Sequence, residues 1–175
     1  MLPGEVAVLI KLGVSFIIEK GAGEKAWAAD RDYMAAGAMV TDRKELISKS
    51  GLILSVNPPL EDNPDVFAEG QILCCVVNPA ENSRWLDKAR QRGLTVLALD
   101  IIPRTTRAQS MDILSSMATV SGYKAVLAAA STLPGFFPMF MSAAGTIKPS
   151  KVLILGAGVA GLQAVAIARK LGAVV

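Results

Sequence analysis

The segment Lys151-Val-Leu-Ile-Leu-Gly-Ala-Gly-Val-Ala-Gly161 decides the fold of this chain, because a short aliphatic run meets three closely spaced glycines. The run over residues 151–155 predicts a β-strand, and the apolar periodicity of residues 162–171 predicts a helix after the glycines. In that context a GxGxxG pattern predicts a dinucleotide site, whereas the same pattern without the strand and the helix carries little information. A glycine-rich turn that binds no ligand stays open as the alternative.

Each glycine of the pattern has a separate mechanical role in such a site. Gly156 allows the tight turn out of the strand, Gly158 lets the backbone approach a pyrophosphate, and Gly161 lets the helix pack closely. The pyrophosphate would lie at the helix N-terminus, where unpaired N–H groups and the helix dipole favour negative charge. The candidate cofactor-binding residues are Gly156, Ala157, Gly158, Val159, Ala160 and Gly161.

The residues after this helix predict that the fold continues past the last residue. Gly172 ends the helix, and Ala173-Val-Val175 has the composition of the first residues of another strand. In a dinucleotide fold an acidic residue roughly 20 positions beyond the glycines holds the ribose hydroxyls, and that position falls just past Val175. We therefore expect an incomplete dinucleotide domain, whose residues do not separate NAD from NADP.

The composition of the chain excludes several classes of function. The 175 residues are 52% hydrophobic and 19% charged, with few aromatics, which is typical of an α/β interior. The formal net charge of +3 is spread along the chain without a basic cluster, so nucleic-acid binding is not expected. Histidine is absent, and Cys74 and Cys75 are adjacent within an aliphatic run without metal-ligand spacing. No metal site is therefore predicted, and the two cysteines are interpreted as reduced core residues.

One long uncharged stretch raises the question of a membrane span. Residues 125–147 contain no charged side chain and are long enough to cross a bilayer. Pro134, Gly135 and Pro138 interrupt the stretch, so we predict a buried helix followed by an apolar loop and no membrane span. The start of the chain, Met1-Leu-Pro-Gly-Glu5, has no features of a secretory signal.

A recurring transition organises the chain: a helix ends in a basic residue and a glycine, and an aliphatic strand follows. Glycine suits the left-handed position after a helix, and the cation complements the helix dipole. Asp42 with Glu45, and the run Asn78-Pro-Ala-Glu81, predict helix N-termini. The alternation of strands and helices predicts a doubly wound parallel sheet covered by helices on both faces. The helix ends of this kind are Lys11-Leu-Gly13, Arg92-Gly93 and Lys170-Leu-Gly172.

A longer helix is predicted to begin near Thr106, with Met111, Leu114 and Met117 on its apolar face. Gly122 near its middle weakens this prediction. A helix of that length is suited to joining two domains. We therefore predict an N-terminal α/β domain over residues 1–130, a connector over residues 131–150, and the start of a Rossmann dinucleotide-binding domain over residues 151–175.

Residues 104–116 follow the predicted strand Thr95–Ile101 at its carboxyl end, where open α/β sheets bind ligands. The segment holds two arginines, a glutamine, an aspartate and several hydroxyl groups. Asp112 and Ser115 share a helix face and could present an acceptor and donors to an amide or a ribose. The alternative is a solvated first helical turn capped by a threonine of the segment. The charges interpreted as solvated are Lys11, Lys44, Lys49 and the pair Glu61-Asp62.

Several segments together resemble the alanine dehydrogenase and nicotinamide nucleotide transhydrogenase superfamily, over essentially the whole chain. The family begins with a strand and a basic segment that would precede Leu2, and its dinucleotide domain continues beyond Val175, so the resemblance implies truncation at both ends. The segments are residues 104–118, Gly122-Tyr-Lys-Ala-Val126, Ala143-Ala-Gly145 and residues 151–164, with Gly21-Ala-Gly23 and Ala36-Gly-Ala38 as earlier landmarks.

Two branches of this superfamily differ in the residues that serve their substrates. Alanine dehydrogenases resemble this chain but carry a lysine in the turn matching Val56-Asn-Pro-Pro59 and a histidine in the strand matching residues 72–77. This chain has Asn57 and the Cys74-Cys75 pair there. Oxidising an amino acid needs proton transfer, whereas passing hydride between two nicotinamides needs mainly two rings held in contact. The residues therefore favour the transhydrogenase branch, an oxidoreductase and translocase.

The resemblance implies the NAD(H)-binding part of a proton-translocating NAD(P) transhydrogenase alpha subunit, with NADP(H) bound by a separate domain or subunit. It implies a cytoplasmic position peripheral to the inner (plasma) membrane, membrane-embedded and NADP-binding partners, and a homodimer. We expect the chain alone to be inactive. The alternatives are an alanine dehydrogenase-type amino-acid oxidoreductase and a catalytically inactive nucleotide-binding fragment.

The same resemblance implies roles for four residues. Arg104 would engage the carboxamide or a phosphate of NAD(H), and Asp112 and Ser115 would bind the carboxamide or the ribose hydroxyls. Gln109 would lie close to the incoming NADP-bearing domain.

Overall fold

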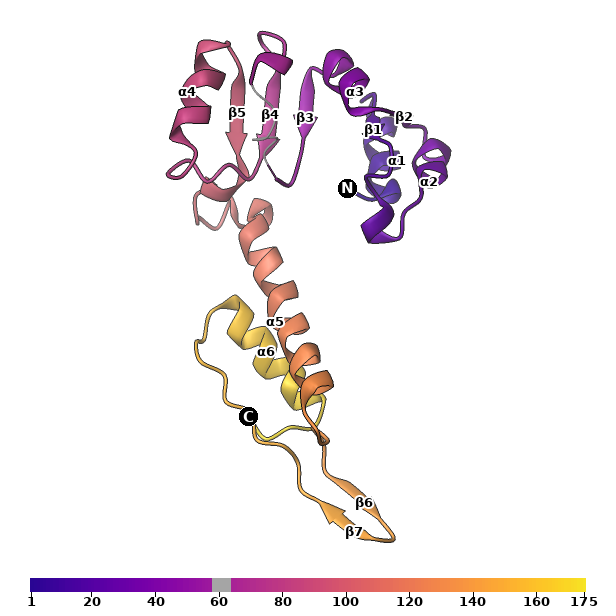
Figure 1. The fold of residues 1–175 in the computed structure, drawn as a ribbon, viewed down its shortest axis with the longest axis vertical. Helices are drawn as coiled ribbons and strands as arrows, with labels where there is room; N and C mark the ends of the chain where they lie inside the picture. Colours follow the sequence, from indigo (N-terminus) through magenta and orange to yellow (C-terminus); the bar gives the residue numbers. More distant parts are fainter. Residues whose placement is uncertain (58–63) are drawn as a thin grey trace. The chain divides into compact units, whose positions relative to one another are not determined.

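The structure is a computed structural model that describes residues 1–57 and 64–175. The chain divides into two compact units, Met1–Leu99 and Asp100–Val175 (Figure 1). Both combine helices with short strands, and the strand pairings described in the first unit are parallel. The predicted α/β class with parallel sheets is therefore confirmed. The domain boundaries near residues 130 and 150 stay predictions.

The first unit alternates helices and strands. Its parallel pairings join β1 to β2 and place β3, β4 and β5 side by side in that order. Parallel strands need crossover connections, and α2 lies in the one that joins β1 to β2, as α4 does in the one that joins β4 to β5. The elements are α1 (Pro3–Lys11), β1 (Ile17–Glu19), α2 (Asp30–Ala35), β2 (Met39–Thr41), α3 (Arg43–Lys49), β3 (Leu52–Leu54), β4 (Ile72–Cys75), α4 (Ser83–Gln91) and β5 (Thr95–Ala98), with 3₁₀ turns η1 (Glu24–Ala26), η2 (Pro64–Val66) and η3 (Leu99–Ile101).

Strand β4 shows why its sequence is aliphatic along its whole length. Leu73 and Cys75 are buried, while Ile72 and Cys74 are half-buried, because neighbouring side chains of a strand point to opposite faces. Cys75 therefore lies in the core as predicted, whereas Cys74, on the other face, is only half-buried. One cluster of the unit contains Ile53, Phe67, Leu73, Ala89 and Leu94, and another contains Val6, Ala28, Tyr33 and Ala38.

The predicted glycine helix ends are confirmed. Gly13, Gly93 and Gly172 have φ angles of +85°, +73° and +87°, in the left-handed region that favours glycine. After α1 the N–H of Gly13 donates to the carbonyl of Ile10 and that of Val14 to the carbonyl of Leu9, at 2.9 and 3.3 Å. This pair of bonds is a Schellman motif, and it satisfies carbonyls that the helix leaves unpaired.

Of the two predicted helix N-termini, one is confirmed and the other is wrong. The Asp42 side chain accepts from the N–H of Glu45 at 2.8 Å and caps α3. Helix α4, however, begins at Ser83 rather than at Pro79. Asn78 has a φ of +48°, and the Asn82 amide donates to the Val77 carbonyl at 2.8 Å. Residues 78–82 therefore form a turn, because these local hydrogen bonds compete with helix formation.

Gln71 is a buried polar side chain that ties three backbone segments together. Its Nε2 donates to the carbonyls of Ile47 and Ser50, both at 2.6 Å, and its Oε1 accepts from the N–H of Ala68 at 2.8 Å.

Gln71→Leu leaves these groups unpaired at a site that is 6% exposed. We expect a loss of about 2 kcal/mol in the free energy of unfolding, measured in urea. The control Gln91→Leu on the exposed face of α4 should stay within about 0.5 kcal/mol of the wild type.

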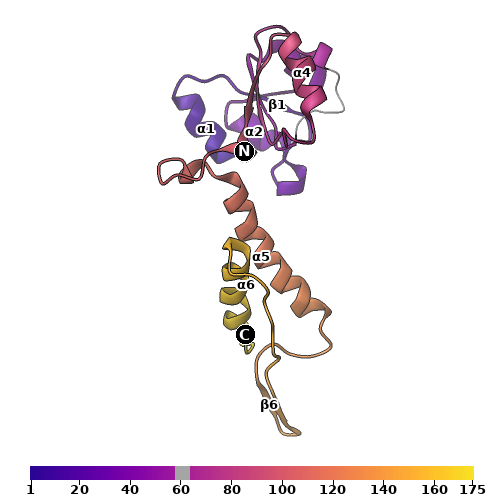
Figure 2. The ribbon, with the colours of Figure 1, turned by 90° about the vertical axis from the view of Figure 1, so that its left-hand side faces the viewer.

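The second unit is built on two helices that lie side by side in both views (Figures 1 and 2). Helix α5 spans Ile113–Thr132 and helix α6 spans Val159–Lys170, with the antiparallel pair β6 (Phe140–Ser142) and β7 (Gly145–Ile147) between them in sequence. The 3₁₀ turn η4 (Gln109–Met111) precedes α5. The buried cluster consists of Val126, Phe137, Ala164, Ala168 and Ala173.

Two elements of this unit are shorter than predicted. The long helix begins at Ile113 instead of near Thr106. The predicted strand over residues 151–155 pairs only at Lys151, as an isolated parallel bridge to Val174. A strand needs a neighbour to pair with, and among the described residues the second unit offers only the short Val174 segment here. Val152 and Ile154 nevertheless pack on the cluster, whereas Leu153 and Leu155 are 83% and 88% exposed, which preserves the strand-like alternation.

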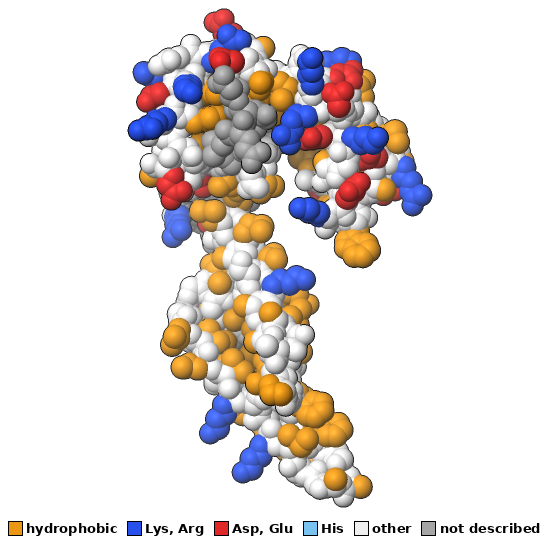
Figure 3. Space-filling model, viewed as in Figure 1, with side chains coloured by type: hydrophobic (Ala, Val, Ile, Leu, Met, Phe, Trp, Pro, Cys, Tyr) orange, Lys and Arg blue, Asp and Glu red, His pale blue; other side chains and the backbone are white. Residues whose placement is uncertain are grey.

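The uncharged stretch 125–147 was predicted to be a buried helix followed by an apolar loop, and its burial in the structure is different. Its helical part is mostly exposed rather than buried, because α6 packs along only one side of α5. The predicted apolar loop contains the exposed β6–β7 hairpin, beside which the rings of Phe136 and Phe140 stack at 5.1 Å. Figure 3 shows hydrophobic side chains on the visible surface of this part of the chain.

One described helix, α5, is long and apolar enough to cross a membrane by length and composition. Its mean hydropathy reaches 1.3, and 11% of that window is buried inside the structure. Length and composition do not separate a membrane span from a helix of a soluble protein. The expectation that the chain has no membrane span therefore stays a prediction.

Candidate functional site

The three motif glycines form the turn that leads into α6, and each has a distinct environment. Gly156 has a φ of +106°, which disfavours any residue with a side chain. Gly158 is the N-cap of α6, and no atom lies within 4 Å of the position where a Cβ would stand. A Cβ on Gly161 would overlap the carbonyl oxygen of Gly156 and lie 2.9 Å from its carbon. Gly156 therefore makes the turn and Gly161 the close backbone contact, while the approach of a pyrophosphate to Gly158 stays a prediction.

Helix α5 closes this turn from one side through a contact that the sequence reasoning missed. A Cβ on Gly122 would overlap the carbonyl oxygen of Ala160 and lie 3.0 Å from its carbon. Ala160 belongs to the first turn of α6, so the backbones of the two helices touch at Gly122. The available signal was a glycine inside a helix, which was interpreted as a weakness of the helix. Close approach of backbones is the other reason for such a glycine.

Asp112 and Ser115, predicted to bind a ligand together, bind each other. Asp112 is the N-cap of α5, its Oδ1 accepting from the N–H of Ser115 at 3.0 Å and its Oδ2 from the Ser115 hydroxyl at 2.7 Å. These bonds satisfy a helix N–H that would otherwise lack a partner. The predicted alternative of a threonine cap is wrong, although Thr105 does accept a long bond of 3.4 Å from the N–H of Ala108.

The Asp112 carboxyl has a pKa below its ordinary value of 3.8. The largest cause is the hydrogen bond from the Ser115 hydroxyl, followed by that from the Ser115 N–H, and the charge of Arg104 is a smaller cause. All of these favour the ionised form. Arg104 is therefore close enough to act on Asp112 electrostatically, and its own side chain is exposed.

Gln109 lies in the 3₁₀ turn before α5, with an exposed side chain. Its carbonyl accepts from the N–H of Asp112 at 3.2 Å, which joins the turn to the cap. The helix rise of about 1.5 Å per residue separates Asp112 from Gly122 by roughly 15 Å along α5. In the second unit, the Arg104–Ser115 segment therefore lies at the N-terminus of α5, and the glycine turn lies beside the middle of the same helix.

The remaining charged residues have simple surroundings. Lys11, Lys44 and Lys49 are exposed, as predicted, and Lys49 pairs with Glu45 at 2.5 Å. The Glu61-Asp62 pair and the Pro58-Pro59 part of the predicted turn lie outside the described residues. Within the described residues no group of three or more His, Cys, Asp or Glu side chains could hold a metal ion.

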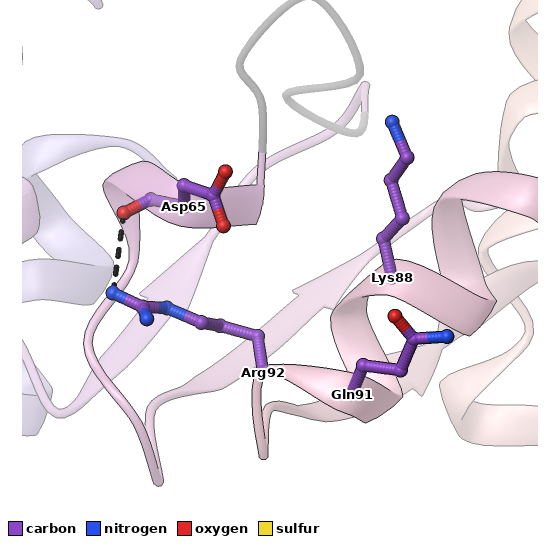
Figure 4. A pocket seen from close by; sticks show the side chains of 4 residues that line it. All are labelled: Asp65, Lys88, Gln91 and Arg92. Carbon is purple, nitrogen blue, oxygen red and sulfur yellow. Dashed lines mark hydrogen bonds between the residues drawn. The ribbon is translucent and has the colours of Figure 1, made fainter.

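A small polar hollow in the first unit contains none of the predicted site residues (Figure 4). The hollow is lined by Asp65, Lys88, Gln91 and Arg92. The Arg92 Nη2 donates a hydrogen bond to the Asp65 carbonyl at 3.5 Å. A second bond joins Arg92 Nε to the Phe67 carbonyl at 3.3 Å. These bonds give the guanidinium a structural role, since it links η2 to the C-terminus of α4.

Substitution of Asp112 separates its capping role from a role of its charge. Asn caps helices about as well as Asp, whereas Ala does not. We expect Asp112→Ala to lower the melting temperature and Asp112→Asn to leave it nearly unchanged. Because the pKa is lowered in the folded state, the ionised cap contributes stability that is complete above pH about 4 and is lost as the pH falls through the lowered pKa. Thermal melts between pH 2 and pH 7 measure this loss as the part of the acid-induced fall in melting temperature that is present in the wild type and absent in Asp112→Asn.

The parallel α/β unit and the glycine turn at the start of α6 define the class of α/β proteins that carry a Rossmann-type nucleotide-binding turn. Within that class the chain belongs to the alanine dehydrogenase/PNT family. Residues 1–121 match the model described as "Alanine dehydrogenase/PNT, N-terminal domain", and residues 125–175 match the corresponding C-terminal domain.

Individual relatives agree with this placement. The NAD(P) transhydrogenase subunit alpha of Cereibacter sphaeroides is 41% identical over 175 residues, covering 99% of this chain and 34% of that protein. The crystal structure of transhydrogenase from Sinorhizobium meliloti matches with a TM-score of 0.91 and 39% identity, over 98% of this chain and 51% of that chain. The alanine dehydrogenase of Mycolicibacterium smegmatis is 30% identical, over 98% of this chain and 47% of that protein. The chain thus spans a third to a half of these relatives and is more similar to the transhydrogenases.

Proposed function

We propose that this chain is the NAD(H)-binding part of an NAD(P) transhydrogenase alpha subunit. In this proposal it holds NAD(H) while hydride passes to or from NADP(H) on a separate domain or subunit, coupled to proton translocation by membrane-embedded partners. The chain acts from the cytoplasmic side, peripheral to the membrane, and as a homodimer. Its domains are residues 1–130, the connector 131–150, and the start of the dinucleotide domain at 151–175.

The observation that carries the proposal is the open space over Gly158 at the N-terminus of α6. A pyrophosphate needs bare backbone N–H groups and room for close approach, and a helix N-terminus adds favourable electrostatics. Gly156 and Gly161 support the same turn by its conformation and its packing. The cofactor-binding residues in this proposal are the six residues 156–161.

The choice of transhydrogenase over alanine dehydrogenase has two supports. The transhydrogenase relative is 41% identical and the alanine dehydrogenase 30% identical. The chain contains no histidine, and it has Asn57 and the Cys74-Cys75 pair in the turn and the strand where the resemblance places the lysine and histidine that serve an amino-acid substrate. Hydride exchange between two nicotinamides needs positioning more than proton transfer, which suits a chain without a histidine base.

The Arg104–Ser115 segment would hold the nicotinamide end of NAD(H). Both oxygens of Asp112 accept from Ser115 and keep further lone pairs, so the carboxylate can also accept from a carboxamide or a ribose hydroxyl. Arg104 is exposed beside it and supplies a cation for the carboxamide oxygen or a phosphate. Gln109, exposed one turn earlier, would face the NADP-bearing partner.

The test places residues 1–175 into the Cereibacter sphaeroides subunit in exchange for the matched segment, and measures reduction of an NADP analogue by NADH. We expect activity in the exchanged protein and at least a tenfold loss in Arg104→Ala, because a hydrogen bond to a charged group contributes about 1.5–3 kcal/mol. The matched control is Arg107→Ala, an exposed arginine of the same loop with no assigned role.

Two outcomes would overturn the proposal. Equal activity in Arg104→Ala and Arg107→Ala would remove the assigned role of Arg104. Alanine-dependent reduction of NAD by the exchanged protein would favour the amino-acid dehydrogenase instead. The lack of any NADH-induced rise in melting temperature would favour the third alternative, a catalytically inactive fragment, since a ligand that binds only the folded state must stabilise it.

A further inference from the structure

Trp27, at the end of η1, has the most exposed large hydrophobic side chain in the part of the chain that the structure describes. It is 97% exposed, whereas Tyr33 on the neighbouring α2 is 3% exposed. A buried aromatic side chain removes about 150–250 Å² of surface from water, and Trp27 contributes nothing of this kind to the packing of the first unit. Its indole is therefore available to a partner outside the unit.

The backbone of Trp27 has a conformation that costs energy. Its φ is +60° and its ψ is +23°, in the left-handed region. There the Cβ of an ordinary residue crowds the following carbonyl oxygen, so glycine or asparagine is the usual occupant and a bulky side chain is an outlier. Trp27 thus stabilises the fold neither through its backbone nor through its side chain. Strained residues of this kind cluster at functional sites.

The turn that carries Trp27 is nevertheless well fixed. The N–H of Trp27 donates to the Glu24 carbonyl and the N–H of Ala28 donates to the Gly23 carbonyl, both at 3.1 Å. A Cβ on Gly23 would lie 2.5 Å from the Ala28 carbonyl oxygen and 2.6 Å from the Tyr33 ring, so the turn packs directly on that buried ring. The indole is presented on a preorganised support, which lowers the entropic cost of binding.

The carboxylates around this turn are directed at its own backbone. Asp30 accepts from the N–H of Gly21 at 2.8 Å, and Asp32 accepts from the N–H of Ala29 at 2.9 Å. The Glu24 Oε1 lies 3.3 Å from the position where a Gly21 Cβ would stand. These acidic groups therefore serve the conformation of the segment.

Two lysines of the same segment have no such role. Lys20 and Lys25 are exposed, and neither forms an ion pair with a residue that the structure describes. Figure 3 shows basic side chains on the visible surface of the part of the first unit that holds α1 and α2. The turn therefore combines an exposed indole with two unpaired cations close to it in sequence.

We propose that Trp27, together with Lys20 and Lys25, is an anchor for the surface of a lipid bilayer that contains anionic phospholipids. The indole lies at the level of the headgroups, where Trp is favoured because its ring is apolar and its N–H is a donor. The lysines are attracted to the negative charge of the lipid phosphates. This inference goes beyond the nucleotide site and does not depend on the proposed function, because vesicle binding and NADH binding are measured separately.

A bilayer surface fits these residues better than a pocket on another protein. Trp is enriched in the interfaces between proteins, but Lys is depleted there. The ammonium group of Lys is strongly hydrated, and at a bilayer surface it is attracted by the anionic lipids without leaving water. One aromatic side chain with two lysines is suited to shallow binding at the headgroups and not to insertion across the bilayer.

Tryptophan fluorescence tests the proposal, because the chain has two tryptophans, Trp27 and Trp85. Trp85 packs against a buried cluster of the first unit, and Trp85→Phe leaves Trp27 as the only source of tryptophan emission. We expect a saturable blue shift with vesicles of phosphatidylglycerol and phosphatidylcholine, and quenching by lipids brominated close to the headgroup. Vesicles of phosphatidylcholine alone should bind about tenfold more weakly, because they lack the negative surface potential.

Variants separate the indole from the lysines in co-sedimentation with the anionic vesicles. Trp27→Gly should bind about tenfold more weakly, the effect of removing one buried aromatic side chain. Its melting temperature should be equal or higher, because glycine adopts the left-handed conformation without strain. Lys20→Gln combined with Lys25→Gln should remove most of the salt dependence of binding. The matched control Lys44→Gln, at an exposed lysine of α3, should bind as the wild type does.

An unshifted Trp27 emission with anionic vesicles would overturn the anchor. Equal binding of the wild type and Trp27→Gly would assign the membrane contact to another surface, and equal binding of anionic and neutral vesicles would remove the role of the lysines; either result overturns the proposal. If Trp85→Phe does not fold, the difference in emission between the wild type and Trp27→Gly provides the same test. A blue shift that appears without vesicles and grows with protein concentration would assign Trp27 to a contact between copies and overturn the lipid partner.

Discussion

Gly158→Ala is expected to weaken NADH binding at least tenfold while leaving the fold intact. The position where its Cβ would stand has no neighbour within 4 Å, and its φ of −75° suits alanine, so the substitution meets no steric barrier in the protein. In a dinucleotide site that space belongs to the pyrophosphate. A methyl group there would displace the phosphate from the α6 N-terminus, and a tenfold change in Kd corresponds to about 1.4 kcal/mol.

Calorimetric titration with NADH measures this change, and a thermal melt verifies the fold. Gly135→Ala is the matched control, because Gly135 lies in the same unit and has the same open surroundings and no positive φ. It should bind NADH as the wild type does. Unchanged affinity in Gly158→Ala would show that no phosphate approaches this turn.

Gly161→Ala, unlike Gly158→Ala, is expected to lower the stability of the fold. The loss of NADH binding follows from that loss of stability. The added Cβ would overlap the Gly156 carbonyl oxygen, and both partners are backbone, so neither can rotate away. Overpacking of this kind costs about 3 kcal/mol at the upper end of its usual range. Because the clash pushes the glycine turn away from α6, NADH binding should fall together with the free energy of unfolding.

Gly122→Ala tests the same packing from α5. Alanine favours a helix over glycine by about 1 kcal/mol, so a solvent-exposed glycine would give a gain. The overlap with the Ala160 carbonyl reverses that sign. Urea unfolding should show destabilisation in both glycine variants and almost none in Ser121→Ala, which replaces an exposed neighbour on α5. A stabilised Gly122→Ala would show that the two helices do not touch there.

Features set by short-range chemistry were predictable from the sequence. The glycine after α1, α4 and α6 adopts the left-handed conformation because each helix needs that residue to close its last carbonyls. The Asp42 cap was equally local, since its partner is three residues away. The roles of Gly156 and Gly161 followed from the spacing of the motif, and the φ angle and the close contact agree with them.

Features set by partners distant in sequence were not predictable. Residues 151–155 have the composition of a strand, yet only Lys151 pairs, because pairing depends on a neighbour that sequence composition does not reveal. Gly122 suggested a weak helix, and its contact with Ala160 lies 38 positions along the chain. At Asn78-Pro79 two local rules competed, and turn formation prevailed over the predicted helix start.

Asp112 shows how a structural role and a ligand role can share one residue. The sequence suggested an acceptor for a ligand, and the structure gives it a helix cap through both oxygens. A cap at the start of α5 also fixes the direction of Ser115 and the position of the loop that carries Arg104. If the proposed site is correct, the cap positions the nicotinamide end, and Asp112→Asn preserves stability while weakening binding.

In the proposed function, the second unit holds NAD(H) between the glycine turn and the segment before α5. The most direct measurement is a titration of the isotopically labelled chain with NADH, followed by amide chemical shifts in NMR. We expect saturable shifts at residues 156–161 and 104–115, which disappear in Gly158→Ala and persist in Gly135→Ala. Absence of saturable shifts at these residues, or the same shifts in Gly158→Ala, would contradict it.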